Sequence, residues 1–296
     1  MQFTEPLFRP PMEVNSVLVR GTQGCTYNKC NFCYMAQGYD FMKASPEHME
    51  SELLAQKHSH GSASNIFIIG CNPLSLPQAI LLEYAGLIQK HYPRFTRISM
   101  HSRVDDIERK SDKELKLLQC AGFGHLYVGT ENGNEEALRK MNKGHGVQKS
   151  REQLRRLDAA GIKYTCQYII GMAGKGMGVR SGLATAKFIN SVHAERVMST
   201  GLTVFPGSRL QEIVARGEFV ESSEREKIEE MLVFFENLTA DIFFEGIHYL
   251  NPLHFRFQTG YEKARYETIE EIKRILNSYS EDQLEKAINR KEMRSL

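Results

Sequence analysis

Short apolar runs alternate with longer amphipathic stretches along the first two thirds of the chain. The apolar runs have the length and composition of buried β-strands and cover residues 14–20, 65–69, 97–101, 125–129, 164–170 and 197–204. Helical spacing of apolar residues is found between them, over residues 46–57, 76–91, 113–121, 134–141, 147–160 and 181–191. This alternation predicts an α/β protein in which helices connect parallel strands. Most turns that contain Gly, Asn or Pro follow a strand, where a barrel-like α/β protein carries its chemistry.

The composition changes near residue 216. The stretches 222–242 and 262–290 are charged and have helical character, and residues 243–257 between them are rich in His and aromatic side chains. We therefore predict a core over residues 1–215 and a mainly helical C-terminal extension over residues 216–296.

Composition and charge narrow the function classes. The chain of 296 residues has a formal net charge of +2, which gives no support for a nucleic-acid footprint. No apolar run is long enough to predict a membrane span, and residues 1–12 lack the pattern of a secretory signal. We expect a cytoplasmic protein, in which the six cysteines are ligands, catalytic thiols or buried apolar residues rather than disulfides.

Three cysteines, Cys25, Cys30 and Cys33, lie together directly after the first predicted strand. Cysteine thiolates hold iron–sulfur clusters, and three of them leave one iron of a four-iron cluster open to a small molecule. A structural zinc site or a ferredoxin cluster needs a fourth ligand at matching spacing. The remaining cysteines stand alone, at Cys71, Cys120 and Cys166. A zinc site, a ferredoxin-type cluster and three unrelated thiols stay open as competing interpretations of the loop.

This loop resembles that of the radical S-adenosylmethionine (SAM) superfamily, C-x3-C-x2-C with an aromatic residue before the last cysteine. Phe32 stands in that aromatic position, and the first gap has four residues, as in an uncharacterised subset of the family. The loop can accommodate the extra residue by a bulge at Tyr27 and Asn28. The resemblance implies a [4Fe–4S] cluster on the three cysteines, SAM at the open iron, and a partial (β/α)6 TIM-like barrel of the radical SAM type.

Later turns resemble family motifs in the same order along the chain. Gly70, Cys71 and Asn72 follow the second strand, where the family binds the SAM amino group, although the usual acidic residue is missing. Cys71 is either a small pocket residue or a functional thiol. Glu131 follows the fourth strand in a segment similar to that of coproporphyrinogen-oxidase-like and Elongator-like members, which implies a SAM contact. Gly171 follows the fifth strand, in the turn that packs against adenine.

Five further residues are weaker candidates. His101 and Arg103 end the third strand, and we expect them to contact SAM or substrate unless they are a satisfied histidine and a surface salt bridge. His248 and Asn251 lie in the aromatic stretch and are candidate substrate contacts, although the sequence slightly favours a structural role. Lys143 either reaches an anionic group or is a solvated charge near a helix end, and the sequence favours the second.

The resemblance implies a radical SAM enzyme that reductively cleaves SAM to a 5′-deoxyadenosyl radical and acts on an unidentified substrate. The expected electron donor is a flavodoxin or a ferredoxin-type protein. A small-molecule substrate is favoured over a nucleic acid, because no separate RNA-binding module is visible. Two more classes stay open: a non-catalytic iron–sulfur or zinc-binding redox or sensor protein, and a tRNA-binding module with a degenerate barrel.

Overall fold

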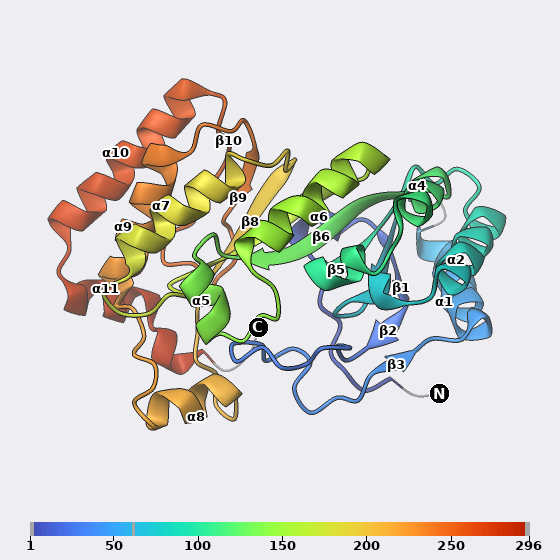
Figure 1. Ribbon diagram of the computed structural model, residues 1–296, viewed down its shortest axis with the longest axis horizontal. Helices are drawn as coiled ribbons and strands as arrows, with labels where there is room; N and C mark the ends of the chain where they lie inside the picture. The colour runs from blue at the N-terminus through green and yellow to red at the C-terminus, as the bar shows by residue number, and fades with distance from the viewer. Residues whose placement is uncertain (1–2, 61–62, 294–296) are drawn as a thin grey trace. The chain divides into compact units, whose positions relative to one another are not determined.

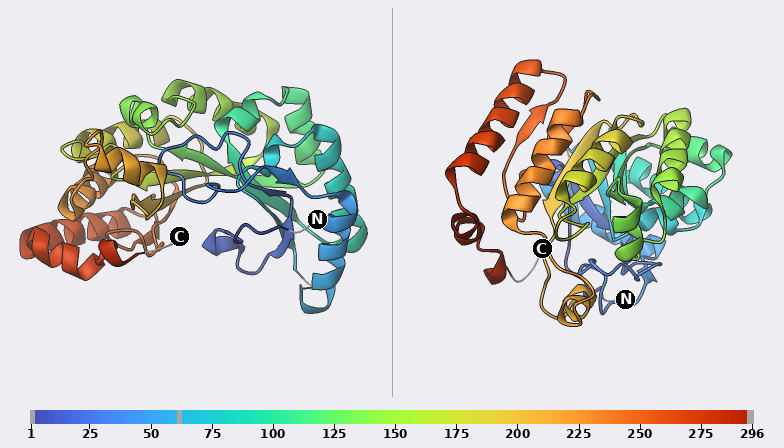
Figure 2. Two further views of the ribbon diagram at one scale, coloured as in Figure 1. Left: turned by 90° about the horizontal axis from the view of Figure 1, so that it is seen from below. Right: turned by 60° about the vertical axis from the view of Figure 1, so that its left-hand side comes forward.

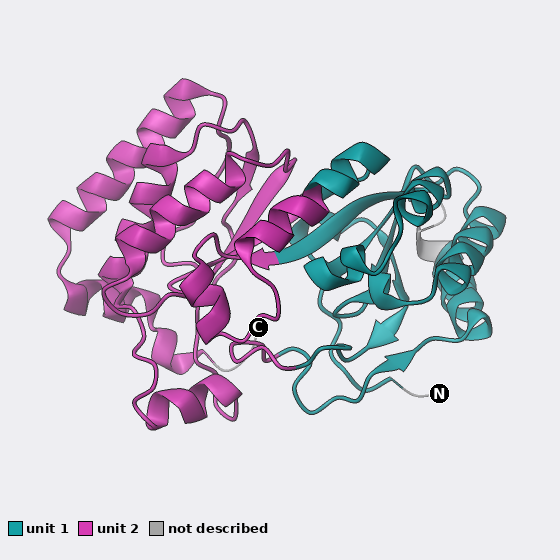
Figure 3. Cartoon of the chain, viewed as in Figure 1, with its two compact units in different colours: residues 1–28, 35–129, 155–164 teal, residues 29–34, 130–154, 165–296 magenta. Residues whose placement is uncertain are grey.

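The computed structural model describes residues 3–60 and 63–293 and is shown in Figure 1. The chain forms two compact units, which Figure 3 distinguishes by colour. Unit 1 comprises residues 1–28, 35–129 and 155–164, and unit 2 comprises residues 29–34, 130–154 and 165–296. The predicted boundary between residues 215 and 216 falls inside unit 2 and stays a prediction. No helix in the described part of the chain is long and apolar enough to cross a membrane.

Unit 1 is built on parallel strands in the order β1-β4-β5-β6. The strands are β1 (Val17–Arg20), β4 (Asn65–Ile69), β5 (Arg97–Arg103) and β6 (Phe123–Glu131), of which the last two residues belong to unit 2. Most strand residues are buried, as expected for parallel strands that are covered on both faces. A two-stranded antiparallel pair, β2 (Thr22–Gln23) and β3 (Met42–Lys43), follows β1.

The helices of unit 1 are α1 (Pro46–His60), α2 (Gln78–His91), α3 (Val104–Glu108) and α4 (Asp112–Cys120). Helix α1 packs against β1 and α2, as Figure 1 shows. Ser111 and Glu114 form a capping box that starts α4. The first strand begins at Val17 rather than at the predicted Val14, because the chain before it forms a 3-10 turn, Pro11–Glu13.

Unit 2 continues the pattern with the strand order β7-β8-β9-β10. The strands are β7 (Lys163–Ile170), β8 (Arg196–Gly201), β9 (Phe243–Glu245) and β10 (Arg256–Gln258), and only the β9–β10 pair among them is antiparallel. Its helices are α5 (Glu135–Lys140), α6 (Val147–Ala160), α7 (Gly178–Ile189), α8 (Arg209–Ala215), α9 (Glu224–Asn237), α10 (Glu262–Ser278) and α11 (Glu281–Ile288). A part of α6 and the first two residues of β7 belong to unit 1.

Helix α9 packs between α7 and α10, as Figures 1 and 2 show. The close approach to α7 depends on Gly182, where an added Cβ would lie 2.4 Å from the carbonyl oxygen of Glu230. The predicted helix over 262–290 is interrupted at Tyr279, and Ser280 caps α11. The aromatic stretch also contributes two strands, β9 and β10, which the sequence did not predict.

Candidate functional site

The cysteine loop carries two residues with left-handed backbone. Gly24 has φ 68°, and an added Cβ there would lie 2.8 Å from the carbonyl oxygen of Asp40. Asn28 has φ 42°, which Asn tolerates better than most residues. Its side-chain amide donates a 3.1 Å hydrogen bond to the carbonyl of Ala36. Asn28 thus has left-handed backbone within the segment for which a bulge is predicted.

In unit 1, Asn72 braces the loop beside Cys25. Its Oδ1 accepts a 3.3 Å hydrogen bond from the backbone of Thr26, and its Nδ2 donates to the Thr26 hydroxyl at 2.7 Å. Nδ2 also lies 3.2 Å from both carboxylate oxygens of Asp106, and burial raises the pKa of this carboxyl. The structure thus uses Asn72, a predicted cofactor contact, to position the chain next to the first cysteine.

The turn after β4 owes its glycine to a close approach of the chain. Gly70 has φ 148°, and an added Cβ would lie 2.0 Å from Oγ1 and 2.9 Å from the carbonyl oxygen of Thr22. The neighbouring Cys71 donates from its thiol to Oε1 of Glu5 at 3.2 Å. Burial raises the pKa of the Glu5 carboxyl. The close approach to Thr22 therefore explains why a glycine stands at position 70 in unit 1. The thiol of Cys71 contacts the Glu5 carboxylate.

His101 and Arg103 are both buried at the end of β5. The His101 side chain packs at right angles on Phe67, with 5.3 Å between ring centroids, and burial lowers its pKa to about 4. It is therefore neutral near pH 7, and its Nδ1 has no hydrogen-bond partner among the described residues. The Arg103 guanidinium lies 4.1 Å from the ring centroid of Tyr27 and 2.7 Å from the carboxylate of Asp105. Arg103 thus forms a salt bridge, as the alternative interpretation expects, but its side chain is buried rather than at the surface.

In unit 2, the segment that carries Cys30 and Cys33 is fastened to the end of α5. The backbone N–H of Asn31 donates to the carbonyl of Met141 at 2.9 Å. Asn142, which has left-handed backbone with φ 49°, donates from its side chain into the same segment. The N–H of Cys33 donates to the carbonyl of Cys30 at 3.3 Å, which closes a tight turn. Cys30 is buried and Cys33 is half-buried.

A buried ion pair lies beside this segment. The ammonium Nζ of Lys143 is 2.7 Å from Oε1 of Glu131, and their side chains are only 4% and 7% exposed. Nζ also lies 5.8 Å from the ring centroid of Phe32, which packs against a hydrophobic cluster that includes Leu138. Glu131 itself has left-handed backbone with φ 64°. The interpretation of Lys143 as a solvated charge is therefore wrong.

A residue that the sequence did not single out, Glu230, is the hydrogen-bond partner of Gly171. The N–H of Gly171 donates to Oε2 of Glu230 at 2.9 Å, and Oε1 of the same carboxyl accepts from the hydroxyls of Tyr168 and Ser181, each at 2.7 Å. Burial raises the pKa of Glu230 to about 7. The available signal was its spacing: Glu230 is four residues before Phe234, on the buried face of α9.

The two candidates of the aromatic stretch, His248 and Asn251, differ in how far hydrogen bonds to the backbone engage their side chains. Nδ1 of His248 accepts the N–H of Leu250 at 3.2 Å, and burial lowers the pKa of His248. The side-chain amide of Asn251 is buried and donates to the carbonyls of Ser199 and Gly246 at 2.9 and 3.0 Å. Asn251 is thus committed to holding β8 and the chain after β9, which gives its predicted substrate contact no support.

The donor chemistry of the loop fits an iron–sulfur cluster. Cys25, Cys30 and Cys33 supply three thiols from one loop, and a cluster can distribute such ligands over separate iron atoms. Within residues 3–60 and 63–293, no group of three or more His, Cys, Asp or Glu side chains is arranged to hold a single metal ion. Of the cysteines outside the loop, Cys120 is exposed and Cys166 is buried.

Comparison with known proteins gives a family match. The model of the radical SAM superfamily matches residues 19–178. The anaerobic magnesium-protoporphyrin IX monomethyl ester cyclase of Cereibacter sphaeroides is 27% identical over 165 residues, which is 55% of this chain and 26% of the cyclase. An uncharacterised protein of Methanocaldococcus jannaschii is 25% identical over 157 residues, 53% of this chain and 48% of that protein. The chain thus spans between about a quarter and a half of the length of these curated relatives.

Solved structures show the same fold at low identity. The radical SAM methyltransferase TsrM of Kitasatospora setae, solved with cobalamin and a [4Fe–4S] cluster, has a TM-score of 0.56 and 17% identity, over 68% of this chain and 39% of TsrM. Coproporphyrinogen III oxidase of Escherichia coli, a radical SAM enzyme, has a TM-score of 0.53 and 18% identity, over 73% of this chain and 50% of the oxidase. These similarities confirm the predicted α/β fold of the radical SAM barrel type.

Proposed function

The chain belongs to the radical SAM superfamily, and on this basis we propose that it is an enzyme that reductively cleaves SAM to a 5′-deoxyadenosyl radical, which acts on a small-molecule substrate. The observation that carries the proposal is that the family match covers the whole three-cysteine loop. The protein would hold a [4Fe–4S] cluster through Cys25, Cys30 and Cys33. When bound, the cluster supplies the electron that breaks the C5′–S bond of SAM and releases methionine.

Candidate residues within each unit have roles that suit this chemistry. Glu131 offers carboxylate oxygens to the hydroxyl or amino groups of SAM, and Lys143 holds that carboxylate in place. Neutral His101 offers Nδ1 as an acceptor, and Arg103 suits a carboxylate. Gly171 supplies a turn with backbone close to the adenine. The protein contributes binding, orientation and exclusion of water, as is general for enzymes whose cofactor carries the reaction.

The same proposal implies an electron donor, a cellular compartment and a class of substrate. The electron would come from a flavodoxin or a ferredoxin-type protein, and reduced thiols in the cytoplasm would keep the loop available for a cluster. We favour a small molecule over a nucleic acid as substrate, because the net charge of +2 is small. The cyclase relative acts on a porphyrin ester. Porphyrin-like acids of similar size are therefore one class of substrate to test first.

The test is anaerobic reconstitution with iron and sulfide, followed by dithionite and SAM. We expect 5′-deoxyadenosine from the wild-type protein and none from Cys30→Ala. Cys120→Ala is the matched control, since Cys120 is exposed and lies outside the loop, and it should retain the product. A protein with a complete cluster but no 5′-deoxyadenosine would instead be a non-catalytic iron–sulfur protein. Bound zinc without iron would identify a zinc protein, and tRNA binding with a steep salt dependence would identify a tRNA-binding module.

A further inference from the structure

The C-terminal segment of unit 2 is attached through polar groups and few apolar side chains. Leu284 is the one buried residue of α11, which lies beside α9 in Figure 1. The carboxylate of Glu281, at the start of α11, accepts the N–H groups of Glu224 and Arg225 at 2.9 and 3.1 Å. A segment with few buried apolar contacts opens locally more easily than the sheet beneath it.

Arg290, just beyond α11, joins three parts of unit 2. Its Nε and Nη2 donate to the two carboxylate oxygens of Glu224, at the start of α9, with 2.9 Å between Nη2 and Oε2. Its Nη1 donates to Oγ1 of Thr203, after β8, at 2.8 Å and to the carbonyl of Leu250, after β9, at 2.9 Å. A guanidinium offers these donors in one rigid fork, so a lysine cannot reproduce the full set.

The Glu224 carboxylate also holds the side chain of Lys227. Its Oε1 accepts a 2.9 Å hydrogen bond from Nζ of Lys227, and the two side chains are 6% and 3% exposed. Burial lowers the pKa of the Lys227 ammonium, and so does the nearby charge of Arg290. Glu224 therefore places the ammonium of Lys227 where burial alone disfavours a charge.

The aliphatic stem of Lys227 lies over Gly171, in the turn after β7. Gly171 has φ 82°, and an added Cβ there would lie 3.0 Å from Cγ and Cε of Lys227. The N–H of Gly171 donates to Glu230, and its carbonyl accepts the N–H of Gly174 at 3.1 Å, which closes the turn. Two side chains of α9 thus fix this turn, Glu230 at the N–H and Lys227 over the Cα.

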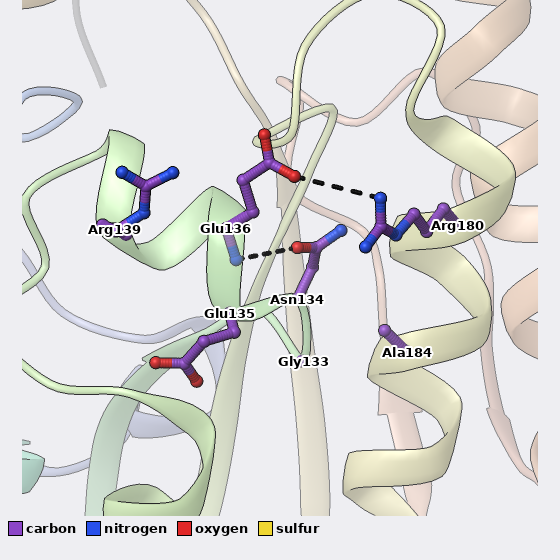
Figure 4. Close-up of a pocket in the computed structure, with 7 residues that line it drawn as sticks. All are labelled: Gly133, Asn134, Glu135, Glu136, Arg139, Arg180 and Ala184. Atoms are coloured by element: carbon purple, nitrogen blue, oxygen red, sulfur yellow. Dashed lines mark hydrogen bonds and ion pairs between the residues drawn. The ribbon is translucent and has the colours of Figure 1, made fainter.

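Helix α7 positions the backbone of α9 by close contact. Gly178 and Gly182 face α9, and an added Cβ at Gly178 would lie 2.7 Å from the carbonyl oxygen of Glu226. Another side of α7 lines a pocket of about 400 Å³ at the start of α5, to which Arg180 and Ala184 contribute (Figure 4). Packing against α7 therefore sets the path of the α9 backbone, whereas the charged side chains at the start of α9 are held by the C-terminal segment.

We propose that Arg290 is a positioning residue for the turn at Gly171. Through Glu224 it holds Lys227 over this turn, so the C-terminal segment, residues 281–293, sets the affinity for the adenosine part of SAM. The inference rests on the proposed function, in which the turn at Gly171 packs against adenine. Because such coupling is reciprocal, SAM bound at the turn also slows the opening of residues 281–293.

The first experiment measures affinity and turnover separately on the reconstituted holoenzyme. Arg290→Gln should weaken the binding of radiolabelled SAM roughly tenfold, the effect of about 1.4 kcal/mol in binding. The rate of 5′-deoxyadenosine formation at saturating SAM should stay within about twofold, because Arg290 acts through other side chains. Arg290→Lys keeps the charge but not the fork, so its affinity should be intermediate. Arg274→Gln is the matched control, since Arg274 is an exposed arginine of α10 that pairs with Glu271, and it should leave the affinity unchanged.

The second experiment follows hydrogen exchange, which needs no SAM cleavage. In the protein without a cluster, Arg290→Gln should speed exchange in residues 171–176 and 224–230 and leave β4, in unit 1, unaffected. In the wild-type holoenzyme, SAM should slow exchange in residues 281–293. The double variant Glu224→Gln with Arg290→Gln should bind SAM no more weakly than the weaker single variant, because both changes break one contact.

Unchanged SAM affinity in Arg290→Gln, or an equal loss in Arg274→Gln, would overturn the proposal. Faster exchange throughout unit 2 would make Arg290 a general stabilising residue, and a maximal rate that falls as much as the affinity would place it at the reacting groups. If Arg290→Gln does not fold, the wild-type comparison decides, since no protection of residues 281–293 by SAM would refute the coupling. If the wild-type holoenzyme binds no SAM, the proposed function fails, and exchange in the protein without a cluster still decides whether Arg290 holds the turn.

Discussion

The carboxylate of Glu131 and the ammonium group of Lys143 form a 2.7 Å ion pair that is almost completely buried. Removal of one partner from such a pair leaves an uncompensated charge in the interior, which typically costs about 3–5 kcal/mol. Replacement of both partners by neutral groups avoids that cost. The pair therefore ties the stability of the α5 region to the residue that the family resemblance assigns to SAM.

We expect Lys143→Met to lower the free energy of unfolding by about 3 kcal/mol, because Glu131 is left buried and unpaired. The double variant with Glu131→Gln should recover most of that loss. Urea unfolding of the two single variants and the double variant measures the coupling. Lys140→Met is the control, since its pair with Glu136 is exposed and should be worth at most about 1 kcal/mol. A loss in the double variant as large as the sum of the two singles would contradict the interpretation.

Glu230 should make the stability of the protein depend on pH. Burial raises its pKa from the ordinary 4.5 to about 7, so the folded state holds a proton that the unfolded state releases. Stability from this group is present below pH 4.5 and is lost as the pH rises through 7, by about 3 kcal/mol in total. Urea unfolding between about pH 4 and pH 8 should show this decline, and Glu230→Gln should reduce it. The exposed Glu262→Gln should leave the decline in place, and a Glu230→Gln curve parallel to wild type would refute the assignment.

Gly70→Ala should be more destabilising than an ordinary substitution at a left-handed glycine. The new Cβ would overlap Thr22 as well as strain the backbone, so we expect a loss of roughly 3 kcal/mol or more in the free energy of unfolding. Gly38 also has positive φ, at 83°, but an added Cβ there meets nothing within 4 Å. Gly38→Ala should therefore cost only about 1 kcal/mol. Thermal unfolding of both variants decides, and equal shifts in Tm would show that Thr22 yields easily.

Asn72→Ala should impair retention of the cluster. It removes the side chain that joins Thr26 to Asp106 beside Cys25, and loss of such supporting contacts typically weakens metal binding about 10- to 100-fold. We expect roughly tenfold weaker iron retention against a chelator after reconstitution. Asn237→Ala, an exposed asparagine on α9, serves as the control. Normal retention in Asn72→Ala, with unchanged circular dichroism, would show that the brace is dispensable.

Continuous apolar runs made the central strands predictable. The run over 65–69 coincides with β4, because every residue from Ile66 to Ile69 is buried. The start of β1 was harder to predict from the sequence, since Val14 is apolar but lies at the end of the Pro11–Glu13 turn and is exposed. The short strands β9 and β10 were missed because three residues are too few for a period to be visible.

The cysteines and the strand-end turns were visible in the sequence because their spacing is local. The environment of the charged residues was not. Lys143 and Glu230 look like solvated charges in the sequence, and only tertiary packing shows that each meets a partner in the interior. Asn72 shows the converse, since its position after a strand was predicted but its contact with Asp106, 34 residues away, was not.

The arrangement around α5 has a consequence for the inheritance of the site. Glu131, the capping residue Asn134, the helix and Lys143 all lie in one uninterrupted stretch, residues 131–143. The two charged partners and the cap therefore come from that stretch alone, whereas the packing around the pair includes Phe32 of the cysteine loop. Recombination with a crossover on either side of the stretch would transfer the ion pair and the cap together, but the pair would stay buried only in a relative that supplies the same packing.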